Sequence, residues 1–333
     1  MRPSVLFATA LLGSALLLSP GAAGGQRAPL LPPVAGLDEL FPIPEDNPLT
    51  PARIALGRRL FFDRLLSRNR SLSCASCHRP DHGFSDSRAR SRGVRGSATR
   101  RHTPTLLNRA YGSFEFWDGR AETLESQVLQ PVQDSLEMDL PVTELLTRLR
   151  AQPAYVSAFA EAFGSQPDAT SLAQALAGYV RTLRSGNSAF DRYREGERDA
   201  LPDAARRGMA LFHGRANCSA CHTGANFTDE RFHNTGVAPG SADPGRFTVT
   251  GDSADYGAFK TPTLREVART APYMHDGRLR TLEAVIDFYD RGGGLDRFLD
   301  HELHALHLSR RDKQDLLAFL RSLTRTASLK PSR

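Results

Sequence analysis

Two Cys-x-x-Cys-His pentapeptides hold all four cysteines of the chain, and they carry its clearest chemical signal. They are Cys74-Ala75-Ser76-Cys77-His78 and Cys218-Ser219-Ala220-Cys221-His222. Two thiols at this spacing can bond to the two vinyl groups of one haem, and the adjacent imidazole then faces the iron as proximal ligand. Zinc sites, redox dithiols and structural disulfides are alternatives, but here each cysteine pair carries its own histidine. The sequence therefore predicts two covalently bound haems c, with His78 and His222 as iron ligands.

The chain also repeats itself in several short strings. Thr103-Pro104-Thr105-Leu106 recurs as Thr261-Pro262-Thr263-Leu264, Asp118-Gly119-Arg120 as Asp276-Gly277-Arg278, and Thr123-Leu124-Glu125 as Thr281-Leu282-Glu283, always 158 residues later. Ordered matches at one offset indicate an internal duplication. We therefore expect two related domains, each with one haem.

The sixth ligand of each iron decides its role, because an open iron binds substrate and a closed iron mainly carries electrons. In the 158-residue register Met274 coincides with Phe116. A thioether can ligate iron and a benzene ring cannot, so we expect His222 and Met274 to hold a high-potential second haem. The first haem would then be open on its distal side. His275 is the alternative ligand, and core packing is the alternative role of Met274.

The sequence predicts that the segments around the haem-binding residues are helices. Thr50 followed by Pro51 predicts a helix start, and Asp168 precedes apolar residues at helical spacing. Ser309 and Asp312 resemble a capping box before a run of leucines. No run of comparable length alternates with strand periodicity. The expected fold class is all-α: two cytochrome c-like haem domains with long loops.

The distribution of charged, apolar, glycine and proline residues along the chain predicts how it is divided. Residues 1–25 read as a cleaved secretory signal, with a basic start and an apolar run too short for a stable membrane anchor. The expected divisions are the signal at 1–25, an extended lead-in at 26–47, haem domains at 48–200 and 201–325, and a tail at 326–333. Glycine-, proline- and serine-rich stretches predict long loops at 81–101 and 236–258.

The overall composition is that of a folded globular protein. The 333 residues are 40% hydrophobic and 24% charged, which excludes a disordered chain and a multi-span membrane protein. The net charge is +6, but no basic run has interleaved aromatic residues, so we expect no nucleic-acid partner. A basic surface that docks an acidic partner remains the alternative interpretation.

These strings resemble the bacterial di-haem cytochrome c peroxidases and the related MauG-type enzymes. The resemblance covers about residues 40–325, and its longest strings are FWDGRAETLESQVLQPVQDSLEM and KTPTLREVARTAPYMHDGR. It implies two cytochrome c-like domains whose haems face a shared interface. It also implies a low-potential N-terminal haem that binds peroxide. The C-terminal haem would take electrons from a small cytochrome or copper protein.

The resemblance also assigns roles to individual residues. Glu137 matches the family's distal glutamate, and Gln127 and Pro131 match residues of the same pocket. A carboxylate at that place can take and return the proton of a hydroperoxide. Trp117, the only tryptophan, matches the family's tryptophan between the haems. An exposed helix-edge glutamate and an interfacial packing residue are the plainer interpretations of Glu137 and Trp117.

Two positions depart from the family pattern. Many of these peroxidases carry a histidine that blocks the N-terminal iron, but the matching position here is about Val94, and the nearest histidines are His82 and His102. The family's inter-haem calcium uses an asparagine where this chain has His102, together with carbonyls near Asp255 and Gly257. Imidazole is a poor ligand for a hard cation. Calcium is therefore doubtful here.

Taken together, these features predict a periplasmic di-haem peroxidase that reduces hydrogen peroxide to water. The alternatives are a MauG-like oxidase that modifies a protein, a di-haem electron carrier, and a sensor that binds a small gas. MauG-type enzymes have tyrosine where this chain has Met274. Homodimer formation stays open.

Overall fold

The computed structural model describes residues 31–37, 41–237 and 243–326. The predicted signal and most of the predicted tail lie outside the described residues. The chain from Pro33 onward forms one compact unit. Among the described residues, no helix is both long enough and apolar enough to cross a membrane.

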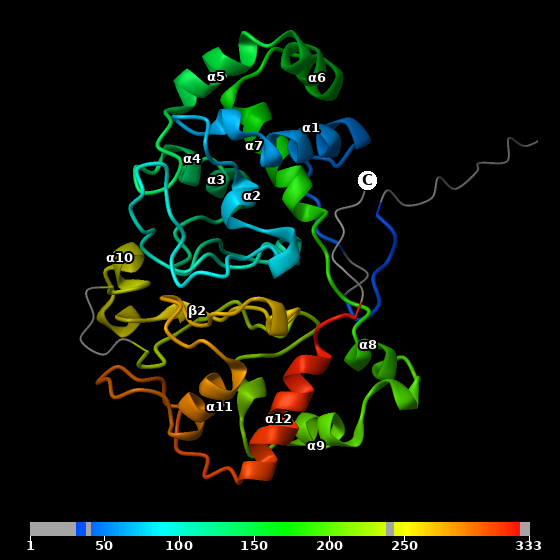
Figure 1. Ribbon diagram of the computed structural model, residues 1–333, viewed down its shortest axis with the longest axis vertical. Coiled ribbons are helices and arrows are strands. Elements are labelled where there is room, and N and C mark those ends of the chain that lie inside the picture. The colour runs from blue at the N-terminus through cyan, green and yellow to red at the C-terminus, as the bar shows by residue number, and fades with distance from the viewer. Residues whose placement is uncertain (1–30, 38–40, 238–242, 327–333) are drawn as a thin grey trace, which may run out of the picture. The chain divides into compact units, whose positions relative to one another are not determined.

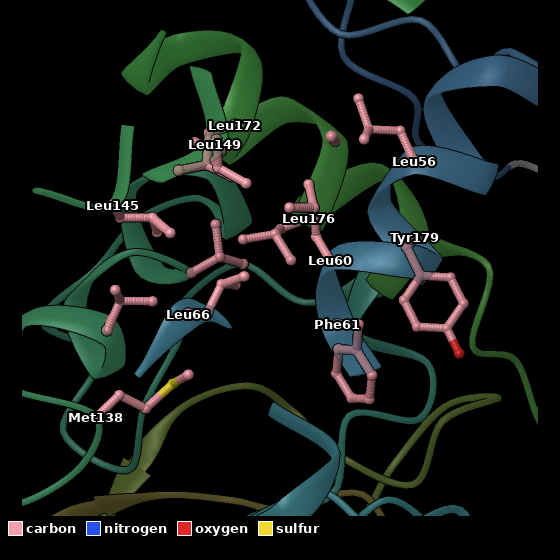
Figure 2. Close-up of a cluster of buried hydrophobic side chains, with 14 of the residues drawn as sticks. Leu56, Leu60, Phe61, Leu66, Met138, Leu145, Leu149, Leu172, Leu176 and Tyr179 are labelled. Carbon is pink, nitrogen blue, oxygen red and sulfur yellow. The ribbon is translucent and has the colours of Figure 1, made fainter. Parts of the chain in front are cut away.

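The first half of this unit consists of helices α1 to α7. They are α1 (Pro51–Phe62), α2 (Cys74–Cys77), α3 (Leu124–Gln127), α4 (Gln130–Gln133), α5 (Val142–Arg150), α6 (Pro153–Phe163) and α7 (Ala169–Arg181). Helix α1 packs beside α7, and their leucines and aromatic rings form the first hydrophobic core (Figures 1 and 2). Gly57 permits this close approach, because a Cβ there would lie 1.9 Å from the Ala175 carbonyl oxygen of α7.

The second half also contains a pair of closely packed helices. It contains α8 (Ala189–Arg194), α9 (Asp203–His213), α10 (Phe247–Thr250), α11 (Leu282–Asp290) and α12 (Arg310–Ser322). Helix α9 packs beside α12 (Figure 1). Gly208 of α9 again makes room, since a Cβ there would lie 1.9 Å from the Asp315 carbonyl oxygen of α12.

Two expectations from the sequence need correction. The fold is mainly helical but not strictly all-α, because β1 (Phe232–His233) pairs antiparallel with β2 (Phe259–Lys260). The stretch 236–258, expected as a loop, contains the one-turn helix α10 between its described ends. A strand of two residues is too short to show alternation of apolar and polar residues, and a single helical turn is too short to show an apolar face. Neither element could therefore be predicted from the sequence.

The predicted helix starts are confirmed. The Arg53 backbone N–H donates to Thr50 Oγ1 at 3.2 Å, and the Ser171 N–H donates to Asp168 Oδ1 at 2.9 Å. Ser309 and Asp312 form the expected reciprocal capping box. Each cap satisfies a backbone donor that the first helical turn leaves unpaired.

Helix α8 packs with the second hydrophobic core. Phe190 of α8 packs against Phe227 and Phe319 in the second hydrophobic core, although the predicted N-terminal domain runs to residue 200. The lead-in touches the connection just before α8, where the Asn187 N–H donates to the Ala35 carbonyl at 2.9 Å. The domain boundary after residue 200 stays a prediction, because the chain from Pro33 onward forms one compact unit.

Two equivalent backbone hydrogen bonds join the halves. The His102 N–H donates to the His275 carbonyl at 2.7 Å, and the Lys260 N–H donates to the Trp117 carbonyl at 2.7 Å. His102 and Lys260 are 158 residues apart, and so are Trp117 and His275. Each half therefore gives and receives the same contact, as expected at a two-fold interface.

Candidate functional site

A cavity of about 1250 Å³ runs through both halves and collects the predicted site residues. The predicted residues that line it are Cys74, Cys77, His78, Trp117, Gln127, Glu137, Cys218, Cys221, His222 and Met274. Its volume exceeds the roughly 300–1,000 Å³ of a usual single-ligand pocket. The two pentapeptides therefore open into a space large enough for more than one bulky group.

The four cysteines are available for covalent attachment. None of them forms a disulfide, and each lies half-buried against the cavity. The first pair occupies the single turn of α2, whose start is capped reciprocally by Ser73 and Ser76. Burial raises the pKa of Cys74 to about 12, and the neighbouring Cys77 and Glu137 charges act in the same direction. The Cys74 thiol would therefore stay protonated at neutral pH.

The two histidines are oriented as metal ligands. His78 Nδ1 lies 3.1 Å from the Phe84 carbonyl oxygen, and His222 Nδ1 lies 3.0 Å from that of Phe227. A carbonyl accepts only from a protonated nitrogen, so Nε2 keeps its lone pair for a metal. Burial lowers the pKa of His78 to about 4 and lowers that of His222. Paired thiols and a neutral imidazole on one cavity form a donor set that fits haem c at both places.

Glu137 faces the cavity as an unpaired carboxyl. No other described residue forms a hydrogen bond or an ion pair with its side chain, whereas its backbone carbonyl accepts from the Val94 N–H at 2.8 Å. Burial, reinforced by the Asp134 charge, raises the pKa of Glu137 from 4.5 to about 7, although Arg120 and Arg100 oppose the rise. A carboxyl with a pKa near neutrality can both accept and donate a proton. Glu137 is thus not the exposed helix-edge glutamate of the plainer interpretation.

Phe116 and Met274 occupy matching positions in the two halves. Both have left-handed backbone, with φ of 66° and 74°, and both line the cavity. The Arg120 guanidinium lies over the Phe116 ring at 3.4 Å from its centroid. His275, the alternative ligand, is stacked on Phe259 with ring centroids 3.6 Å apart. Met274 therefore remains our predicted second ligand, and Phe116 offers no donor at the equivalent place.

Trp117 is fixed at the contact between the halves. Its indole Nε1–H donates to the His102 carbonyl at 2.8 Å, while its own carbonyl accepts from Lys260. An indole with a hydrogen-bonded N–H is held in one orientation. The packing interpretation and the predicted relay role are both compatible with this position.

The histidines considered as blocking groups are held by other contacts. His82 does not line the cavity, and its Nδ1 lies 3.2 Å from Asp81 Oδ2. Both ring nitrogens of His102 are engaged, by the Arg88 carbonyl at 3.0 Å and by Ser85 Oγ at 3.3 Å. His82 therefore lies outside the cavity, and His102, which lines the cavity, already uses both ring nitrogens.

Sequence reasoning missed His233. Its ring lies between two carboxylates, with Nε2 2.9 Å from Asp229 Oδ2 and Nδ1 2.6 Å from Asp300 Oδ2. Cys221, Asp229 and His233 offer donor atoms within 4.8 Å of one another, the only such group among the described residues. Both His233 nitrogens are already engaged, so a separate metal site there would first have to break these contacts. Asp300 is too far along the sequence from His233 for any spacing rule to have found the pair.

Comparisons with known proteins agree with this geometry. A family model described as "Di-haem cytochrome c peroxidase" matches residues 51–199. The methylamine utilization protein MauG of Methylorubrum extorquens is 44% identical over 86% of this chain and 82% of its own. The cytochrome-c peroxidase IdrP1 of a Pseudomonas species is 37% identical over 92% and 89%. The solved structure of a MauG-like protein associated with microbial copper homeostasis is 33% identical, with a TM-score of 0.82 over 88% of this chain and 96% of that one.

Proposed function

Because the chain belongs to the di-haem cytochrome c peroxidase family, which includes the MauG proteins, we propose that it reduces hydrogen peroxide with electrons from a small redox protein. The reaction consumes one hydrogen peroxide, two electrons and two protons, and yields two waters. Bound haem would supply the electron transfer. The haem held by His222 would receive electrons from the donor, and the haem held by His78 would pass them to peroxide.

The observation that carries this proposal is the unpaired Glu137 carboxyl beside the first pentapeptide. Its pKa of about 7 lets the carboxylate take a proton from one peroxide oxygen. It can then return this proton to the oxygen that leaves as water. Gln127 lines the same cavity and offers an amide that can orient the peroxide.

The second half has the features of an electron-entry site. Met274 would complete the coordination of the His222 site, and a His/Met pair raises the reduction potential. Trp117, held between the halves, offers an oxidisable ring on the way from one site to the other. An electron carrier or a gas sensor would have no need for an unpaired carboxyl of raised pKa.

The test is the peroxide-dependent oxidation of a reduced small cytochrome c. We expect two haems c per chain by alkaline pyridine spectra and turnover from the fully oxidised protein, because His82 lies outside the cavity and both ring nitrogens of His102 have other partners. Turnover only after half-reduction would keep the peroxidase but contradict the open site. No turnover in either form would refute the proposal.

The second candidate is a protein-modifying oxidase. It is favoured by the 44% identity to a protein named MauG, and opposed by Met274, where MauG-type enzymes have tyrosine. If oxidase activity is the true function, Met274→Tyr should preserve or raise peroxide-driven oxidation of an acidic protein substrate. For a peroxidase, the same variant should lose turnover with reduced cytochrome c, because a phenolate ligand lowers the reduction potential.

Three further features belong to this proposal. The 158-residue repeat and the reciprocal contacts between the halves support an internal duplication with one haem in each half. The N-terminal signal would export the protein to the periplasm, where c-type haems and small electron donors meet. The net charge of +6 suits docking of an acidic donor surface.

A further inference from the structure

Arg101 forms ion pairs with one carboxylate from each half. Its Nη1 donates to Asp118 Oδ2 at 2.6 Å, and its Nε and Nη2 donate to the two oxygens of Asp243 at 2.7 and 2.8 Å. Only 14% of the Arg101 side chain and 6% of the Asp118 side chain are exposed. A two-point guanidinium–carboxylate pair is strong and directional. One fixed cation therefore joins the first half to the second.

These ion pairs involve the residues next to the indole hydrogen bond of Trp117. Arg101 precedes His102, whose carbonyl accepts the indole N–H, and Asp118 follows Trp117. The two dipeptides are thus joined twice, once by the ion pair and once by the indole hydrogen bond. The His102 N–H continues the path into the second half through the His275 carbonyl. Movement of Arg101 would therefore change the position of Trp117.

A calcium ion does not fit at this place. Calcium prefers six to eight oxygen ligands, and the family resemblance would put one of them on residue 102. His102 presents nitrogens there, and both are already engaged. The two nearby carboxylates, Asp118 and Asp243, are bound by the Arg101 guanidinium instead.

The loop that carries Asp243 reaches the other expected calcium segment. The Gly257 N–H donates to the Pro244 carbonyl at 2.9 Å, so the residue after Asp243 pairs with the segment whose carbonyls the resemblance assigns to calcium. Arg101 therefore joins the same two parts of the chain that a calcium ion would join.

We propose that the Arg101 guanidinium replaces an inter-domain calcium ion and acts as the positioning residue for Trp117. The halves are then held together around the indole without a divalent metal. This inference concerns the placement of Trp117 and holds for a peroxidase and for an oxidase alike, so its test uses no peroxide.

The first measurement is made on the wild-type holoprotein. After exposure to calcium and desalting, elemental analysis should find no stoichiometric calcium, and EGTA should leave the midpoint of thermal unfolding unchanged. One calcium per chain, or a lower midpoint in EGTA, would overturn the proposal.

The second measurement compares Arg101→Gln with Arg95→Gln. Arg95 is the matched control, because it pairs with Asp139 at 2.7 Å wholly within the first half. Trp117 is the only tryptophan, so ultraviolet resonance Raman spectra report its indole N–H hydrogen bond without overlap. We expect the indole band to shift in Arg101→Gln alone, with a fall of about 5–10 °C in the unfolding midpoint.

Two further variants keep the test decisive. Arg101→Lys restores the charge but not the two-point geometry, so it should recover the unfolding midpoint only in part. Asp243→Asn weakens the ion pair of Arg101 with the second half and keeps its pair with Asp118. This variant replaces Arg101→Gln in the test if Arg101→Gln does not fold. An unchanged indole band in both Arg101→Gln and Asp243→Asn would refute the positioning role.

Discussion

Replacing Glu137 by glutamine removes the one unpaired carboxyl beside the first pentapeptide while keeping its size. Glutamine cannot take a proton from peroxide, and proton transfer by a positioned side chain contributes about 10²–10⁴-fold to a rate. We therefore expect Glu137→Gln to lower kcat/KM for peroxide by about that factor. Donor binding should not change, because Glu137 lies in the first half.

The same substitution should stabilise the protein, but only at high pH. Burial raises the pKa of Glu137 from 4.5 to about 7, so the folded state holds a proton that the unfolded state has lost between these values. Wild-type stability therefore falls as pH rises from 4.5 to 7, by about 3 kcal/mol in total. Glutamine never ionises, so the variant escapes this loss. Its unfolding midpoint should exceed the wild-type value by on the order of 5 °C at pH 8 and by little at pH 5.

Two assays on the holoprotein check this reasoning. The kcat/KM of the wild type should rise with pH to a plateau, with its midpoint near pH 7, and this rise should be absent in Glu137→Gln. The matched variant Asp134→Asn should move the midpoint to lower pH, because the Asp134 charge helps raise the pKa of Glu137. Equal stabilisation by Glu137→Gln at pH 5 and pH 8, or full turnover in that variant, would refute the argument.

Three further outcomes follow from the site and the core. Met274→Ala should abolish the optical band of methionine-ligated haem and lower the potential of one haem, as redox titration would show; an unchanged spectrum would leave His275 as the ligand. Trp117→Phe should slow electron exchange between the haems in stopped-flow records while keeping the haem count, and an unchanged rate would contradict the relay role. Arg265→Gln should lower the free energy of unfolding, measured with denaturant, by about 3–5 kcal/mol. The substitution removes the Arg265 partner of Asp191, and each side chain of this pair is only 1% exposed. A loss under 1 kcal/mol would show that water reaches the pair.

The sequence predicted features whose signal lies within a few residues. The capping of α1, α7 and α12 follows from side chains that bond to the backbone three residues away. The two pentapeptides likewise carry their chemistry in five consecutive residues. Gln127, Glu137 and Trp117 were identified only through the family resemblance, because their local spacing does not relate them. All three line the same cavity.

Contacts between distant segments could not be predicted in this way. The Arg101–Asp243 pair joins two loops, and the His233–Asp300 pair joins β1 to a loop; no periodic pattern relates their positions. Their geometry depends on how these segments cross, which is set by packing over the whole unit. The raised pKa of Glu137 could not be predicted either, because burial and the Asp134 charge act on its carboxyl only in the folded chain.

If the halves arose by duplication, as we propose, the places where they differ indicate how one repeat could serve two roles. The reciprocal contact keeps its backbone hydrogen bonds, but its side chains are His102 and Trp117 in one half against Lys260 and His275 in the other. A backbone contact tolerates any side chain, so the interface can stay two-fold while the groups that face the cavity diverge. Phe116 and Met274 show the same freedom, since both have left-handed backbone at matching positions and only one can ligate iron. If this reasoning holds, exchanging them (Phe116→Met with Met274→Phe) should leave the fold intact and move the six-coordinate haem from the second half to the first.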